Sequence, residues 1–301
     1  MLSVNHICKN YGKKNILKDV TFEINRGEIV GVLGPNGVGK TTLIKLLCGI
    51  NRQDNGEIRK DHCKIAVVFD FNGLYTNFNA IENLKLFLGD DNDDIIEEYL
   101  KKFNLWERRK EKVSKYSKGM LRKLAVVRAL ITNPDLLILD EPFDGIDVEN
   151  KKIWIDLLGE WVKEKNCSVI ISSHILSEVE QMCSRILILS KGRLIWNLYR
   201  EEWNDMSKGN LRYVIRPVTS SVTFERLKNC LNSYHCKVER KDSDLVIEIY
   251  DEEKFDLADE IDQIITSNRF KIVEKYYIKR NLEELYLKII ENDLIDERQK
   301  E

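Results

Sequence analysis

Between a short apolar run and a helix-forming segment, the chain reads Gly34-Pro35-Asn36-Gly37-Val38-Gly39-Lys40-Thr41-Thr42. This run matches G-x-x-x-x-G-K-[ST], a pattern in which glycines let the backbone curl and turn several N–H groups toward phosphate oxygens. Residues 28–33 are predicted to form a buried strand before it, and residues 40–49 a helix whose N-terminus adds positive potential. This context favours a phosphate loop over a plain turn. We expect Lys40 to reach the terminal phosphates and the Thr41 hydroxyl to bind Mg²⁺.

A second apolar run, residues 136–139, ends in the acidic pair Asp140 and Glu141. A carboxylate at such a strand end can hold Mg²⁺, usually through water, and its neighbour can act as a general base toward an attacking water. An exposed strand end with two acids is common by itself. Together with the phosphate loop, however, the pair predicts a metal site at Asp140 and a base at Glu141.

Up to about residue 205, predicted strands alternate with helices. Short runs of leucine and β-branched residues predict further strands over residues 64–69, 168–172 and 185–189. The alternation is typical of an α/β fold with a mainly parallel sheet covered on both faces. Residues 4–9 and 18–25 are predicted to form an opening antiparallel pair.

Residues 80–124 are predicted to form a helical subdomain with polarised charge. Residues 90–98 contain six acids and no base, whereas residues 101–123 are strongly basic. Solvated helix faces are one interpretation, and a docking surface for another chain is the other.

Beyond residues 1–206, the phosphate-site motifs cease. Residues 207–301 are predicted to form a small α+β accessory domain, which is within the size of an independent domain. Its predicted strands are residues 211–216, 236–240, 244–250 and 271–278, and its predicted helices are residues 223–232, 252–268 and 282–291.

Composition excludes several classes of protein. The 301 residues carry 48 Lys and Arg against 50 Asp and Glu, a net charge of -2, which argues against broad nucleic-acid binding. The 43% hydrophobic content excludes a mostly disordered chain. No apolar run approaches the roughly 18 residues of a membrane helix, and the first residues are mixed and polar, so we expect a cytosolic protein. The odd count of 7 cysteines, without a Cys-x-x-Cys pair, indicates reduced thiols.

Over residues 1 to about 205, these motifs and their order resemble the ATP-binding-cassette (ABC) ATPases. The segment Tyr116-Ser117-Lys118-Gly119-Met120 stands where the family has its Leu-Ser-Gly-Gly-Gln signature. The resemblance implies that Ser117 and Gly119 meet the γ-phosphate of ATP held by the opposite subunit. Taken alone, Ser117 could simply cap a helix.

Three further positions match the same family. The resemblance implies that Tyr11 stacks on adenine, that Asp147 is the loop aspartate after the second acid, and that His174 is the switch histidine. Each has a structural alternative: an edge aromatic, a turn residue and a structural histidine, respectively.

Two departures from the family pattern concern the signature and a glutamine. Lys118 and Met120 replace a glycine and a glutamine of the signature, a form similar to that of drug- and peptide-export ATPases. Asp70 stands where the family has a glutamine that senses Mg²⁺ and water; it could still ligate Mg²⁺ but cannot donate an amide hydrogen bond. An acidic residue there resembles the ATPases of bacteriocin- and lantibiotic-immunity exporters.

The resemblance implies a P-loop NTPase core with an antiparallel β subdomain and a helical subdomain. It further implies an ATPase that uses ATP and Mg²⁺ and powers export of a drug, peptide or antibiotic. A polytopic membrane permease would dock at the helical subdomain, and ATP would join a homodimer or a heterodimer at the cytoplasmic face of the membrane. No nucleic-acid partner is expected. The alternatives are a soluble ABC ATPase that acts on ribosomes or DNA, and an ATP-binding regulatory module with weak turnover.

Overall fold

The computed structural model describes residues 1–69, 73–143, 146, 148–206, 208–218, 224–231, 234, 236–241, 244–249, 257–279 and 281–298. Its contacts divide the chain into two compact units, Met1–Arg200 with Asn292–Glu301, and Glu201–Glu291. The sequence places the boundary after residue 206 instead, and groups the last residues with the second domain. The first unit contains the phosphate-loop motif.

A six-stranded sheet forms the centre of the first unit, in the order β5-β6-β7-β3-β8-β9. Strands β5 to β8 of this order run parallel, and only β9 is antiparallel to its neighbour β8. The α/β prediction is confirmed. The bounds are β3 (Ile29–Leu33), β5 (Ile65–Val68), β6 (Leu136–Asp140), β7 (Ser168–Ser172), β8 (Arg185–Ser190) and β9 (Arg193–Tyr199).

Register brings three strand ends to one edge of this sheet. Strands β3, β6, β7 and β8 are buried along their whole length, which explains why their apolar runs do not alternate. Asp140 is level with Ser172, and Ser172 is level with Val32. The residues that follow β3, β6 and β7 therefore meet at the carboxyl edge, where open α/β sheets bind ligands.

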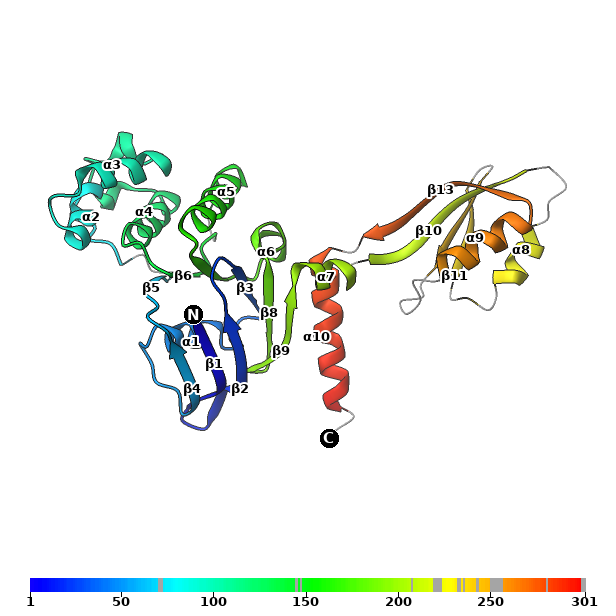
Figure 1. The fold of residues 1–301 in the computed structure, drawn as a ribbon, viewed down its shortest axis with the longest axis horizontal. Coiled ribbons are helices and arrows are strands. Elements are labelled where there is room, and N and C mark those ends of the chain that lie inside the picture. Colours follow the sequence, from blue (N-terminus) through cyan, green and yellow to red (C-terminus); the bar gives the residue numbers. More distant parts are fainter. Residues whose placement is uncertain are drawn as a thin grey trace. The chain divides into compact units, whose positions relative to one another are not determined.

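A second sheet, with the order β2-β1-β4, is wholly antiparallel (Figure 1). Its strands are β1 (Leu2–Tyr11), β2 (Lys14–Ile24) and β4 (Asn55–Lys60). Alternate apolar residues of β1 and β2 join the core of the central sheet and of helix α1 (Lys40–Leu47). The opening antiparallel pair is as predicted, whereas β4 was not predicted, because it is almost entirely exposed and lacks apolar alternation.

The helical region consists of α2 (Ala80–Leu88), α3 (Asp93–Lys102), two short 3₁₀ turns (Trp106–Arg108 and Val113–Lys115) and α4 (Lys118–Leu130). Helices α2, α3 and α4 lie together in Figure 1, and α4 contacts both α2 and α3. A capping box starts α2, in which Asn79 and Glu82 each accept a backbone hydrogen bond from the other. Surface ion pairs within α3, such as that between Lys101 and Glu97, neutralise part of the acidic charge.

Two further helices belong to the first unit, and a third begins at Arg200 and continues into the second unit. These are α5 (Val148–Lys165), α6 (Leu176–Met182) and α7 (Arg200–Met206). Trp154 of α5 is buried and packs edge-on against Phe103 and Phe143. This aromatic cluster ties α5 to the end of α3 and to the turn after β6.

The second unit has a β-α-β-β-α-β order. An antiparallel sheet, β11-β12-β10-β13, carries α8 and α9 against one face (Figure 1), with an apolar core that includes Tyr213, Ile247 and Ile261. This is the split βαβ arrangement. The bounds are β10 (Lys208–Pro217), α8 (Phe224–Leu231), β11 (Cys236–Lys241), β12 (Asp244–Ile249), α9 (Leu257–Ser267) and β13 (Phe270–Lys279). Helix α10 (Leu282–Arg298) follows, and its residues from Asn292 onward are grouped with the first unit. Among the described residues of the whole chain, no helix combines the length and apolar character needed to cross a membrane.

Candidate nucleotide-binding site

The loop between β3 and α1 has a backbone that requires glycine. Gly34 has φ 155° and Gly39 has φ 118°. A Cβ on Gly34 would lie 2.6 Å from the Leu189 carbonyl oxygen, and one on Gly39 would lie 2.8 Å from a Leu17 methyl carbon. Because a Cβ would clash at both positions and φ is positive at both, only glycine permits this curl.

Two side chains at the start of α1 are fixed by contacts with the loop and the acidic strand end. The Lys40 ammonium donates to the Gly34 carbonyl oxygen at 2.8 Å, and its Nζ lies 3.7 Å from Glu141 Oε1. The Thr41 hydroxyl donates to Asp140 Oδ2 at 3.0 Å. Lys40 is only 7% exposed, so its charge is held in place beside the loop.

The acidic pair is held by the neighbouring strand β7. The Ser172 hydroxyl donates to Asp140 Oδ1, and it also accepts the Glu141 backbone N–H at 3.0 Å. Arg122 of α4 donates to the Glu141 carbonyl oxygen. Glu141 itself has φ 49°, an uncommon value for a residue with a side chain, and these bonds hold it there.

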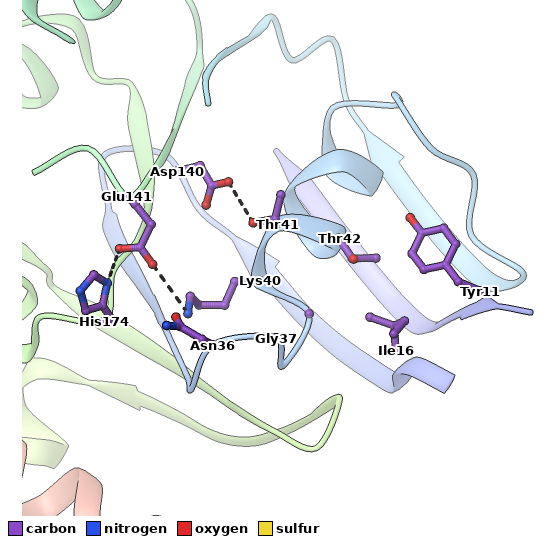
Figure 2. A pocket seen from close by; sticks show the side chains of 11 residues that line it. Tyr11, Ile16, Asn36, Gly37, Lys40, Thr41, Thr42, Asp140, Glu141 and His174 are labelled. Carbon is purple, nitrogen blue, oxygen red and sulfur yellow. Dashed lines mark hydrogen bonds and ion pairs between the residues drawn. The ribbon is translucent and has the colours of Figure 1, made fainter. Parts of the chain in front are cut away.

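His174, just after β7, lies against the second acid. Its Nδ1 is 2.7 Å from Glu141 Oε2 (Figure 2). The Glu141 side chain is 23% exposed and that of His174 is 49% exposed. Glu141 therefore touches Lys40 through one oxygen and His174 through the other, and remains accessible to water.

A pocket of about 470 Å³ joins these groups to Tyr11 at the end of β1. Tyr11 and Ile16 lie at one end in Figure 2, Glu141 and His174 lie at the other, and Thr41 and Thr42 lie between them. The size is within the range of small-molecule sites. The residues that line it are Tyr11, Ile16, Asn36, Gly37, Gly39, Lys40, Thr41, Thr42, Asp140, Glu141 and His174.

Most predicted site residues converge here, but Ser117 and Gly119 do not. Ser117 is the N-cap of α4, where its hydroxyl accepts the Met120 N–H at 3.3 Å, and it is exposed. Neither residue lines the pocket of its own chain. Gly34, Pro35 and Val38 form the loop without lining the pocket. Asp70 and Asp147 lie outside the described residues.

Sequence reasoning missed the roles of Ile16, Ser172 and Arg122. Ile16 could have been found from its place in the strand that follows the Tyr11 turn. Ser172 stands two residues before His174, but its bonds to Asp140 and Glu141 depend on strand register. Nothing in the sequence marks Arg122 among its basic neighbours.

Comparison with known proteins gives a consistent result. The ABC transporter family profile matches residues 17–144. The ABC transporter ATP-binding protein MJ1023 of Methanocaldococcus jannaschii is 36% identical over 64% of this chain and 76% of its own length. The bacitracin transport ATP-binding protein BcrA of Bacillus licheniformis is 32% identical over 71% of this chain and 74% of its own length. A solved ATP-binding subunit of an ABC transporter aligns with TM-score 0.63 and 28% identity, over 68% of this chain and 92% of its own.

The chain therefore belongs to the ATP-binding subunits of ABC transporters. Such subunits are ATPases, they form dimers and they act with membrane subunits. Similarity extends over at most 71% of this chain in these relatives.

Proposed function

We propose that this chain hydrolyses ATP in the pocket between Tyr11 and His174, and that this drives export through a separate membrane subunit. The observation that carries the proposal is the convergence of Lys40, Thr41, Asp140, Glu141 and His174 on one sheet edge, with an aromatic ring at the far end of the same pocket. Adenine would stack on Tyr11, and the phosphates would extend toward Glu141.

The residues present fit both a triphosphate and Mg²⁺. Gly34 and Gly39 let the loop curl where a Cβ would clash, with Lys40 beside it, and a curled glycine-rich loop of this kind can turn backbone N–H groups toward a phosphate. Thr41 and Asp140 present a hydroxyl and a carboxylate 3.0 Å apart, and oxygen ligands of this kind are those that Mg²⁺ prefers. When bound, Mg²⁺ would neutralise charge on the β- and γ-phosphates. Asp70 is proposed as a further ligand.

Glu141 would act as the general base. Its carboxylate takes a proton from a water whose oxygen attacks the γ-phosphorus, and the bond to ADP breaks as phosphate forms. His174 holds one carboxylate oxygen at 2.7 Å and so orients the base. Lys40 would bind the terminal phosphates, because its ammonium already lies beside the loop, where it donates to the Gly34 carbonyl oxygen.

A second ATP-binding subunit would complete the site. Ser117 and Gly119 are accessible at the N-terminus of α4, and they lie outside the pocket of their own chain. We infer that they meet the γ-phosphate held by a partner subunit, which is either a copy of this chain or a related ATPase. ATP then stabilises the dimer, and hydrolysis releases it.

The membrane subunit would dock on the helical subdomain. Leu86 and Phe87 of α2 are each at least half exposed there. Tyr75, in the segment just before α2, is also more than half exposed and stacks on Phe78. Large exposed apolar side chains in one region are typical of an interaction site. The protein would accordingly work at the cytoplasmic face of a membrane.

Export of a drug, peptide or antibiotic is the transport function that the relatives favour. Among them are the bacitracin transport protein and the lantibiotic transport ATP-binding protein SrtF of Streptococcus pyogenes, which is 36% identical over 65% of this chain and 89% of its own length.

A paired substitution tests the composite site. Ser117→Glu puts a negative charge where the partner's γ-phosphate is proposed to lie, while an acidic residue at a helix N-terminus remains compatible with folding. We expect this variant to bind ATP normally and to lose turnover, whereas Ser114→Glu, at an exposed position in the same basic segment, retains it. Equal turnover in both variants would refute the composite site. If the partner is a copy, mixing Ser117→Glu with Lys40→Ala restores part of the turnover.

A further inference from the structure

The Tyr11 ring, at the end of the pocket where the adenine is proposed to lie, is held by residues that do not line the pocket. Tyr11 is 48% exposed and is followed by a turn with Gly12 at φ 59°. A half-exposed ring at the end of a strand keeps rotamer freedom unless something restrains it, and ordering such a side chain on ligand binding lowers affinity. The restraint comes from the segment after α1.

Two residues of that segment, Asn51 and Asp54, make the contacts. The Asn51 side-chain amide donates to the Tyr11 hydroxyl at 2.6 Å. Asp54 accepts the Asn10 backbone N–H at 2.6 Å and the Lys9 ammonium at 2.8 Å. We call Asn51 and Asp54 the Tyr11 clamp, since one fixes the far end of the ring and the other fixes the backbone just before it.

The clamp also places a cation near the ring. Lys9 Nζ, held by Asp54, lies 5.6 Å from the centre of the Tyr11 ring, which is within the range of a cation–π contact. The hydrogen bond from Lys9, and after it that from the Asn10 backbone, lowers the pKa of the Asp54 carboxyl. Asp54 is therefore ionised at neutral pH, where its carboxylate can accept the hydrogen bonds from Lys9 and the Asn10 backbone.

The same helix serves both ends of the pocket. Helix α1 begins with Lys40 and Thr41 at the phosphate end, and the backbone N–H groups of Ile50 and Asn51 donate to the Lys45 carbonyl oxygen near its C-terminus. With eight residues, α1 spans about 12 Å. The clamp thus fixes Tyr11 at a set distance from the phosphate loop.

We propose that Asn51 and Asp54 are positioning residues that hold Tyr11 ready to stack on the nucleotide base, and so set the pocket's affinity for the base separately from its affinity for the triphosphate. This inference rests on the proposed function, in which ATP occupies the pocket. It assigns no chemical step to either residue.

Equilibrium titrations with Mg-ATP and with magnesium tripolyphosphate, which lacks a base and a ribose, test the proposal. Asn51→Ala should weaken ATP binding about two- to tenfold, as expected for one lost hydrogen bond, and leave tripolyphosphate binding unchanged. Tyr11→Phe removes the other partner of the same bond, so it should show the same loss. The double variant should then lose no more than either single variant. In turnover assays over a range of ATP concentrations, KM for ATP should rise and kcat should stay constant.

Gln53→Ala serves as the matched control, because the Gln53 amide lies in the same segment and donates, at 3.5 Å, to the Gly56 carbonyl oxygen rather than to Tyr11. Unchanged ATP affinity in Asn51→Ala would overturn the proposal, as would equal losses for ATP and tripolyphosphate or additive losses in the double variant. Failure of the wild-type chain to bind ATP would instead refute the proposed function itself, and this inference with it.

Discussion

Glu141→Gln separates binding from chemistry most cleanly in this site. The substitution preserves side-chain size but removes a carboxylate whose oxygens lie 2.7 Å from His174 Nδ1 and 3.7 Å from Lys40 Nζ. A carboxamide does not take up a proton at neutral pH. The contribution of a general base, about 10²–10⁴-fold in kcat, should therefore be lost, which corresponds to about 3–5 kcal/mol of barrier.

ATP affinity should not fall in the same variant. The carboxylate carries a negative charge close to where the triphosphate is proposed to lie, and it competes for Lys40, which is only 7% exposed. Removing the charge frees Lys40 for the phosphates. We expect a dissociation constant for ATP equal to or below that of the wild type.

The assay combines phosphate release at saturating Mg-ATP with an equilibrium titration of nucleotide. Glu160→Gln, at an exposed position of α5, makes the same chemical change away from the pocket and should retain full turnover. A kcat for Glu141→Gln within threefold of wild type, at normal affinity, would refute Glu141 as the base.

Three other predictions concern the loop and the thiols. Lys40→Ala should weaken ATP binding at least about tenfold, because charged hydrogen bonds contribute about 1.5–3 kcal/mol each; an unchanged affinity in titration would contradict the site. Gly34→Ala forces a Cβ to 2.6 Å from the Leu189 carbonyl oxygen and should lower the free energy of unfolding by about 1–3 kcal/mol. The Cβ of Gly37→Ala meets no atom within 4 Å, so that variant should lose stability only through the strain of its positive φ. Thermal unfolding should therefore show the larger loss for Gly34→Ala, and the reverse order would count against the loop geometry. Burial raises the pKa of Cys183 to about 12, so this thiol stays protonated near pH 8 and should react with iodoacetamide after exposed Cys230; mass spectrometry that finds the opposite order would show a different packing.

The centre of the fold and one face of the site could be predicted from sequence, because local patterns carry them. Fully buried parallel strands read as apolar runs, and residues directly after β3, β6 and β7 must meet at one edge once the strands are in register. The phosphate-loop motif predicted Lys40 and Thr41, and the apolar run that ends in two acids predicted Asp140 and Glu141. His174 was expected only from the resemblance to the ABC ATPases.

The remainder depends on contacts that no local pattern encodes. Ser172 supports Asp140 from 32 positions away, and Asn51 reaches Tyr11 from 40 positions away. Strand β4 is polar and exposed and is defined by backbone pairing with β1, so its residues give no periodic signal. The unit boundary likewise follows from contacts, since Asp293 in the last helix accepts a hydrogen bond from Ser190 of β8.

The central claim is that this chain is the ATPase of a membrane transporter. The most direct test is affinity purification of the tagged Glu141→Gln variant from native membranes, in mild detergent with Mg-ATP, followed by mass spectrometry. We predict recovery of a polytopic membrane protein in a fixed stoichiometric ratio, and loss of the tagged ATP-bound dimer when Lys40→Ala is added. Recovery from the soluble fraction with ribosomal proteins or DNA, and with no membrane protein, would contradict the claim.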